Sequence, residues 1–208
     1  METLKLVEGI SHPIVECHDL ECIIPDDVNF TIAESYTTSE GKHRHLYSVG
    51  LNGKLSTYFH GLIYQKIVPL LFADKTFFHT WPVTPKTIFK NTDLNLSIFK
   101  DDIGWSQGLH EDPKVFLLSG VVHLQDCEQG TTFIDSHNNI TYTAPTKKFS
   151  GAFWLNAHGA RHYVDKVTKE RMGYLIVMPW KCFEPYNFAG NHFGATASNT
   201  INFRDFYQ

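Results

Sequence analysis

The feature of this 208-residue chain that most limits its fold is a succession of short β-rich segments in its second half. β-Branched and aromatic residues dominate them, and turn-forming residues separate them about every 8–12 positions. The stretch 115–124 is almost entirely apolar, which indicates a strand buried on both faces. The pattern predicts an all-β sandwich, jelly roll or barrel. The expected strands cover residues 94–99, 115–124, 131–134, 141–143, 152–155, 162–164 and 171–178.

The first half of the chain is expected to support this β-rich core. Apolar residues within 55–72 recur at spacings of three and four, which predicts a helix that Pro69 would end early or kink. Residues 80–90 contain two prolines and are interpreted as a connector. Further short strands are expected at residues 14–17, 23–24 and 46–49.

The length predicts a single domain over residues 1–208, because domains commonly contain about 150 residues. Within it, residues 1–93 would supply the N-terminal strands and helix, and residues 94–180 the core. Residues 181–208 include a stretch rich in Gly, Ala, Ser and Asn, and are expected to form a C-terminal loop or tail.

Charge and composition indicate which classes of protein the chain is not expected to belong to. Eighteen Lys and Arg against 22 Asp and Glu leave a net charge of −4, which disfavours a dedicated nucleic-acid-binding protein. Neither a signal peptide nor an apolar run long enough for a membrane span is visible, so we expect a cytoplasmic location. The four cysteines are not densely spaced and are expected to be reduced thiols.

A candidate metal-binding motif is His110-Glu111-Asp112. On an extended backbone, side chains at positions i and i+2 leave the same face, so His110 and Asp112 can point to one site. Such a short motif has little weight alone and needs a distant third ligand. Two histidines and one carboxylate form the facial triad that holds Fe(II) and leaves coordination positions open.

His162 is the preferred third ligand, with His158 as the alternative. His162 begins an expected strand and Arg171 begins the next, so we expect the two strands to form a hairpin that brings both residues to one cavity. A guanidinium is well suited to binding a carboxylate with two hydrogen bonds.

These residues also have interpretations that involve neither metal binding nor catalysis. His110 and Asp112 could be a hydrogen-bonded pair in a loop, and Arg171 could pair on the surface with Glu170 or Asp165. The sequence His43-Arg44-His45 resembles a cupin metal motif, but it lacks a following Glu at useful range and is interpreted as a solvated strand.

The ordered set of motifs between residues 95 and 178 resembles the Fe(II)/2-oxoglutarate-dependent oxygenases, which have a double-stranded β-helix, or jelly-roll, core. The similarity is closest to compact prolyl-hydroxylase-like members that use Arg to bind the cosubstrate. It covers somewhat under half of the chain. The residues that carry it are Leu96–Phe99, Gly104, His110–Asp112, Val121–Leu124, Gln129–Phe133, Phe153–Asn156, His162, Val164, Val167 and Arg171.

The resemblance implies that His110, Asp112 and His162 bind iron and are catalytic, and that Arg171 binds the distal carboxylate of 2-oxoglutarate. Phe99 or Asp101, together with His123 and Thr132, would lie near the cosubstrate. The chain departs from the family pattern at two positions. Gly173 stands where the family often has Ser or Thr after Arg-x, and Phe99 stands in place of a Tyr.

The resemblance therefore implies a mainly β enzyme that uses Fe(II), 2-oxoglutarate and O2, with ascorbate as an optional addition. Its reaction would be hydroxylation of a peptidyl or free amino-acid side chain, or of another small molecule. Two alternatives remain. One is a jelly-roll protein that binds a metal or carboxylate without turnover, and the other is a cupin-like metalloenzyme that does not use 2-oxoglutarate.

Overall fold

A computed structural model of the chain describes residues 2–8, 10, 12–21, 32–48, 54–73, 85–113, 115–156 and 160–181. Several of the expectations above lie outside these residues. They are the strand at 23–24, the alternative ligand His158, the thiols of Cys22 and Cys182, and nearly all of the C-terminal tail. Cys17 and Cys127 are described, and both are buried free thiols.

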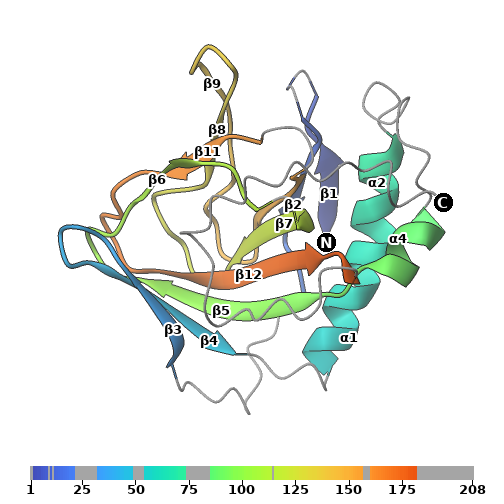
Figure 1. Cartoon of the computed structure of the whole chain (residues 1–208), viewed down its shortest axis with the longest axis horizontal. Helices are drawn as coiled ribbons and strands as arrows, with labels where there is room; N and C mark the ends of the chain where they lie inside the picture. Colours follow the sequence, from blue (N-terminus) through green and yellow to red (C-terminus); the bar gives the residue numbers. More distant parts are fainter. Residues whose placement is uncertain are drawn as a thin grey trace.

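The described residues form two antiparallel sheets (Figure 1). The larger sheet has the order β1-β2-β10-β7-β12-β5-β4-β3, and the smaller has the order β6-β11-β8-β9. The strands of the larger sheet are β1 (Thr3–Leu6), β2 (Ile14–His18), β10 (Gly151–Leu155), β7 (Phe116–His123), β12 (Arg171–Pro179), β5 (Asn95–Asp101), β4 (His43–Ser48) and β3 (Ile32–Thr37). Those of the smaller sheet are β6 (Gln107–His110), β11 (His162–Val164), β8 (Thr132–Ile134) and β9 (Ile140–Thr143).

The chain alternates between the two sheets in the manner of a jelly roll. Strands β5, β7, β10 and β12 lie in the larger sheet, while β6, the hairpin β8–β9, and β11 lie in the smaller one. Such alternation produces the double-stranded β-helix, so the predicted fold class is confirmed. Strands β1 and β2 extend the larger sheet at one edge, and β4 and β3 extend it at the other.

One expected connection is wrong. The sequence suggested that β11 and β12 form a hairpin, but β11 pairs with β6 and β8, whereas β12 pairs with β5 and β7. The link between them crosses from one sheet to the other. His162 and Arg171 still line one cavity, because each side chain points into the space between the sheets.

The expected helix at 55–72 is confirmed as three consecutive segments, α1 (Lys54–Gly61), the π-helix η1 (Leu62–Ile67) and α2 (Val68–Ala73). The helix continues past Pro69. The preceding turn is wide, since the Val68 N–H donates to the Ile63 carbonyl five residues back. This widening reduces the clash that a proline ring makes with the preceding turn.

The expected connector at 80–90 is partly wrong, because residues Pro85–Asn91 form helix α4. Its proline occupies the first helical position, where a missing N–H costs no hydrogen bond. None of the helices in the described part of the chain combines the length and the apolar character that a membrane span requires.

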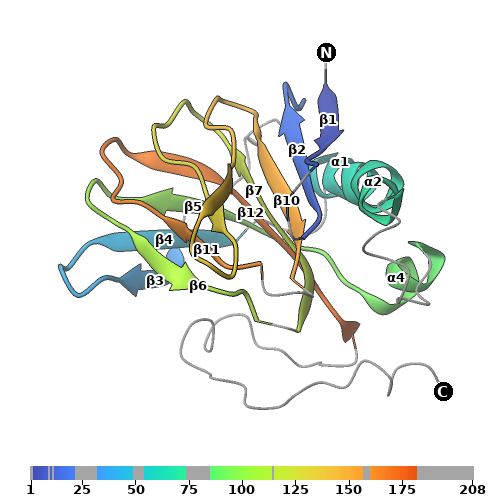
Figure 2. The ribbon, with the colours of Figure 1, turned by 90° about the horizontal axis from the view of Figure 1, so that it is seen from above.

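The helices cover the outer face of the larger sheet, and the smaller sheet lies over its inner face (Figures 1 and 2). Alternate residues of β12 show this arrangement. Tyr174 packs edge-on against Phe59 of α1, with ring centroids 5.1 Å apart, whereas Arg171 and Leu175 face the cavity between the sheets. The larger sheet is therefore buried on both sides, which explains the continuous apolar run of β7.

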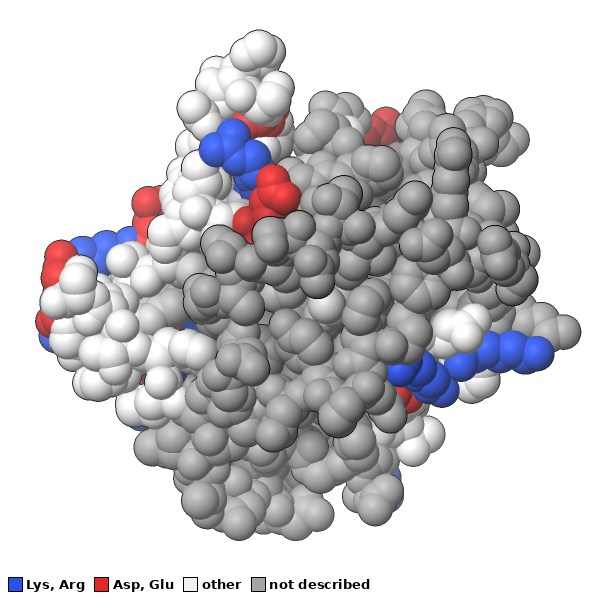
Figure 3. Space-filling model, viewed as in Figure 1, with Lys and Arg blue, Asp and Glu red and all other residues white. Residues whose placement is uncertain are grey.

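On the face drawn in Figure 3, acidic side chains lie next to basic ones among the described residues. Two of the ion pairs are Lys166–Glu40 and Lys100–Glu170, each with a nitrogen–oxygen distance of 2.8 Å.

Candidate metal centre

Pairing between two strands of the smaller sheet brings the predicted metal ligands together. His110 ends β6, and His162 begins β11 directly opposite it in the antiparallel register. Their rings are 4.3 Å apart between centroids. Asp112 follows β6 by two residues, so its side chain leaves the extended chain on the same side as His110.

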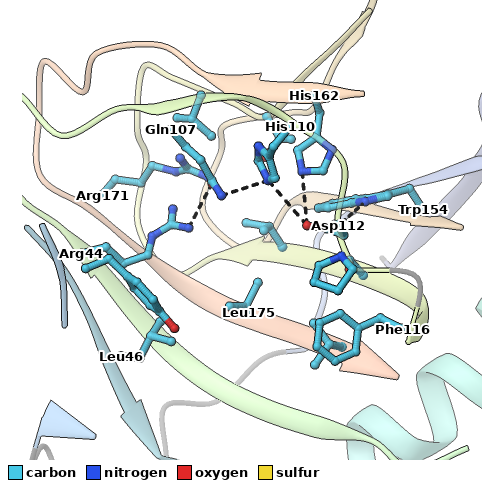
Figure 4. A pocket seen from close by; sticks show the side chains of 17 residues that line it. Arg44, Leu46, Gln107, His110, Asp112, Phe116, Trp154, His162, Arg171 and Leu175 are labelled. Atoms are coloured by element: carbon cyan, nitrogen blue, oxygen red, sulfur yellow. Dashed lines mark hydrogen bonds and ion pairs between the residues drawn. The ribbon is translucent and has the colours of Figure 1, made fainter. Parts of the chain in front are cut away.

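The three side chains converge on one point (Figure 4). Asp112 Oδ1 lies 3.6 Å from His110 Nε2 and 3.7 Å from His162 Nε2, and all the candidate ligand atoms lie within 4.8 Å of one another. Neighbouring ligands of a metal with bonds of about 2.1 Å are separated by about 3 Å. The distances from Asp112 Oδ1 to the two imidazole nitrogens therefore exceed this separation by less than 1 Å.

Hydrogen bonds outside this set orient each ligand atom. His162 Nδ1 donates to the Ala160 carbonyl at 2.7 Å, and His110 Nδ1 donates to the Gly108 carbonyl at 2.9 Å. The Nε2 lone pair of His162 therefore faces the convergence point, whereas His110 Nε2 lies at that point and also accepts a hydrogen bond from the Gln107 amide at 2.9 Å. The indole N–H of Trp154 donates to Asp112 Oδ2 at 3.1 Å, which leaves Oδ1 for a metal. Such outer contacts are typical of metal sites.

Burial and charge shift the pKa values of Asp112 and His162. Burial disfavours the charged form of Asp112, but the His162 and His110 imidazoles outweigh it and hold the pKa of this carboxyl below its usual range. Burial lowers the pKa of His162, although Asp112 opposes that effect. A charged carboxylate beside a neutral imidazole is the state that binds a metal cation.

The ligands form one end of a cavity between the sheets, with an empty volume of about 600 Å³ that includes its open mouth. Arg44, Gln107 and Arg171 form a polar side of this cavity, as Figure 4 shows. The remaining wall is largely apolar and includes Leu46, Phe116, Val121, Leu175 and Val177.

Arg171 is the main positive group facing the cavity. Its side chain is 1% exposed, and its three guanidinium nitrogens have no hydrogen-bond partner within the described ranges. Burial lowers its pKa to about 10, so it stays protonated at neutral pH. The alternative of a surface pair with Glu170 or Asp165 is wrong, because Arg171 is buried and its ion-pair partner is Asp101, at 3.5 Å. A buried guanidinium without hydrogen bonds is costly, and an anionic ligand would relieve that cost.

The other residues suggested as cosubstrate contacts lie beside the cavity and are absent from its lining. Phe99 is fully buried beneath Arg171, whose guanidinium carbon is 5.1 Å from the ring centroid. His123 is buried behind Phe99, with ring centroids 6.5 Å apart. Thr132 faces the Thr143 hydroxyl at 3.3 Å, and its neighbour Thr131 lines the cavity instead. Their contact with a cosubstrate stays a prediction.

The two departures from the family pattern are linked in space. Gly173 lies directly opposite Phe99 in the β5–β12 register. A Cβ at position 173 would lie 2.6 Å from the Val122 carbonyl oxygen and 2.7 Å from the Phe99 ring. Serine or threonine therefore has no room at position 173, since the phenyl ring occupies that space and supports Arg171.

Sequence reasoning missed Arg44 and Gln107. Arg44 lies between two outward-facing histidines, and the sequence predicts a solvated strand for all three, yet the Arg44 side chain is buried and lines the cavity. Alternation along a strand was the available signal, because the residue between two exposed side chains points inward. Gln107 lies three residues before His110, and its amide is 2.9 Å from His110 Nε2.

The donor set fits a first-row transition metal. Two imidazoles and one carboxylate on one side of a cavity suit Fe(II) in an open site, and a second cavity group, Arg171, lacks a hydrogen-bonding partner among the described residues. His110, Asp112 and His162 would hold the metal, and Arg171 would bind an anion beside it.

Comparisons with known proteins find solved structures only: no family model matches, and no curated protein matches in sequence. The chain is similar to a prolyl-4-hydroxylase from Pseudomonas putida, with a TM-score of 0.47 at 10% identity, over 71% of this chain and 78% of that one. It is also similar to the viral collagen prolyl hydroxylase of Paramecium Bursaria Chlorella virus-1, with a TM-score of 0.43 at 14% identity, over 67% and 79%.

An oxidoreductase of the 2OG-Fe(II) oxygenase family from Burkholderia pseudomallei matches with a TM-score of 0.43 at 14% identity, over 66% of this chain and 68% of that one.

Proposed function

We propose that this chain is an Fe(II)- and 2-oxoglutarate-dependent dioxygenase. One observation carries the proposal: a single cavity holds a His-Asp-His ligand set together with a buried guanidinium that has no hydrogen-bond partner in the described residues. The ligand set supports iron binding, and the guanidinium supports binding of a small carboxylate next to the iron.

Each residue has a distinct task in this proposal. His110, Asp112 and His162 hold Fe(II) from one side, and Trp154 keeps Asp112 Oδ1 turned toward it. Arg171 binds the distal carboxylate of 2-oxoglutarate and thereby orients the cosubstrate. When bound, Fe(II) supplies the O2 activation that couples decarboxylation of 2-oxoglutarate to oxidation of a second substrate.

The rest of the cavity supports a small organic substrate. Leu46, Leu175 and Val177 present an apolar wall that excludes water from the reacting groups. We infer that the substrate is a peptidyl or free amino-acid side chain or another small molecule, and that the reaction is hydroxylation. A cavity with both an apolar wall and a charged end suits such ligands.

The decisive experiment mixes the protein with Fe(II) and 2-oxoglutarate without oxygen and records the visible absorption spectrum. We expect a metal-to-ligand charge-transfer band from the chelate, followed in air by succinate release with a suitable substrate. Absence of the band at saturating 2-oxoglutarate would contradict the proposal and favour a metalloprotein that does not use this cosubstrate. A band without turnover of any tested substrate would favour a binding protein.

Variants assign the band to these residues. His110→Ala and Asp112→Ala should abolish it through loss of the metal, whereas Arg171→Ala should weaken 2-oxoglutarate binding at least about tenfold and retain the metal. The matched control is His43→Ala. His43 lies on the opposite face of β4 from Arg44 and contacts Thr37, so its loss should leave the band unchanged.

A further inference from the structure

A second buried arginine lies in register with Arg171. Arg44 on β4 and Arg171 on β12 are both directly opposite Asp101 of the intervening strand β5. The side chains are 7%, 1% and 0% exposed for Arg44, Arg171 and Asp101. The cluster thus places two positive charges and one negative charge side by side at the polar side of the cavity.

Arg44 and Arg171 do not share the Asp101 carboxylate equally. Arg44 Nε donates to Asp101 Oδ1 at 2.6 Å and Arg44 Nη2 donates to Oδ2 at 2.9 Å, so both oxygens of Asp101 are held. Arg171 Nη1 lies 3.5 Å from Oδ2 and makes no hydrogen bond to it. Bidentate pairs of this kind are stronger than a single long contact.

Other contacts keep Arg44 in this position. Its guanidinium carbon lies 3.9 Å from the Trp105 ring centroid and 4.9 Å from that of Phe99. Its Nη1 donates to Gln107 Oε1 at 3.3 Å. Stacking on two rings and three hydrogen bonds to side chains leave Arg44 little freedom to release Asp101.

The cluster consequently retains one net positive charge, and that charge lies on Arg171. Burial of an uncompensated charge is unfavourable, so the site favours a ligand group with a single negative charge, such as a carboxylate. If Arg44 did not hold Asp101, the carboxylate could turn to Arg171 and satisfy it. A ligand carboxylate would then have to displace a bound internal one.

We propose that Arg44 is a positioning residue for carboxylate binding: by holding both oxygens of Asp101, it keeps Arg171 available to the distal carboxylate of the cosubstrate. This inference rests on the proposed function for the identity of the ligand. The unequal sharing of Asp101 rests on this chain's own contacts.

Calorimetric titration of the Mn(II)-loaded protein with 2-oxoglutarate tests the role without turnover. Arg44→Met should raise the Kd for 2-oxoglutarate about tenfold, because Asp101 is then free to pair with Arg171. The Kd for Mn(II) should stay the same. The double variant Arg44→Met/Asp101→Asn should recover most of the lost affinity, because asparagine has no charge to offer Arg171.

The matched control is Lys100→Met, which removes a cation from the neighbouring position of β5. Lys100 pairs with the exposed Glu170, so its loss should leave the affinity for 2-oxoglutarate unchanged. Unchanged affinity in Arg44→Met would overturn the proposal, as would a double variant as weak as the single one. Should Arg44→Met fail to fold, Arg44→Lys carries the same test, since one ammonium group cannot hold both oxygens in the same way.

Crystal structures of the wild type and of the Arg44 variant give a readout that needs no 2-oxoglutarate. Asp101 should turn from 3.5 Å to hydrogen-bonding distance of Arg171 in the variant. An Asp101 that stays turned away would overturn the inference, whatever ligand binds. If the wild type binds Mn(II) but not 2-oxoglutarate, the proposed cosubstrate is wrong, and the position of Asp101 still decides the role of Arg44.

Discussion

At the scale of single residues, the metal centre depends on side chains that do not themselves bind the metal. Asp112 has two oxygens, and the Trp154 indole N–H occupies only Oδ2. His110 and His162 each have two ring nitrogens, and a backbone carbonyl engages only Nδ1. Asp112 and His162 thus each have one atom held and one atom presented to the convergence point, which reduces the reorganisation that metal binding requires. At His110 the Gln107 amide also contacts Nε2, at 2.9 Å.

Replacing Trp154 tests this orientation. Trp154→Phe keeps an aromatic ring next to His162 but removes the N–H that holds Asp112 Oδ2. We expect metal affinity to fall about 10–100-fold, as for other outer contacts of metal ligands. Mn(II) titration measures the change. Trp105→Phe makes the same replacement beside Arg44 and should leave metal affinity unchanged; equal effects of the two variants would argue against the role of the hydrogen bond.

At the scale of elements, the two faces of β12 lie in different surroundings, one in the apolar core and the other at the cavity. Tyr174 and Ile176 pack within the core that the helices share, while Arg171 and Leu175 face the cavity. Gly173 lies between these residues, where β5 and β7 approach so closely that no Cβ fits. The strand can therefore hold a buried charge at one end and a dense core along the rest of its length.

Adding one methyl group to β12 should be costly. In Gly173→Ala the new Cβ meets the Val122 carbonyl oxygen and the Phe99 ring, so we expect a loss of about 1–3 kcal/mol in unfolding free energy. Urea denaturation measures this loss. Gly61→Ala is the control, because Gly61 has helical dihedrals and open space at its Cβ, and alanine should stabilise that position by about 0.5–1 kcal/mol. A neutral Gly173→Ala would show that the strands can move apart.

At the scale of the whole molecule, a hydrogen bond away from the site also joins the two sheets. Tyr142 of β9 in the smaller sheet donates to Glu16 Oε2 of β2 in the larger sheet at 2.8 Å. His18 contacts the other oxygen of Glu16 at 2.6 Å. Burial opposes charge on Glu16, but the hydrogen bonds from His18 and Tyr142 outweigh it and lower the pKa of Glu16.

This contact predicts a dependence of stability on pH. Because the pKa of Glu16 is lower in the folded than in the unfolded protein, its contribution is present above the unfolded value of about 4.3 and is lost as the pH falls below it. Tyr142→Phe should cost about 1 kcal/mol at pH 7 and less near pH 3. Urea denaturation at both values checks this; a cost that is the same at both would contradict the role of the charged carboxylate.

Metal binding should stabilise the whole fold, since the ligands come from two strands far apart in sequence. At a free metal concentration of about 100 times the Kd, the expected gain is about 2.7 kcal/mol. For a chain of this length, the melting temperature would rise by roughly 5–10 °C. Calorimetry with Mn(II) and then with a chelator measures the shift and its reversal. The same shift in His110→Ala would indicate binding elsewhere.

The sequence by itself determined the local features of this protein. Strand periodicity predicted the order of the elements, and the i and i+2 spacing predicted that His110 and Asp112 leave one face, because both depend on neighbours along the chain. The tertiary structure alone decided which sheet each strand joins. It separated β11 from β12, brought Arg44 to Asp101 across 57 positions and made Gly173 necessary opposite Phe99. These contacts arise from strand pairing over long sequence separations. The pattern of residues along the chain does not specify which strands pair or in which register.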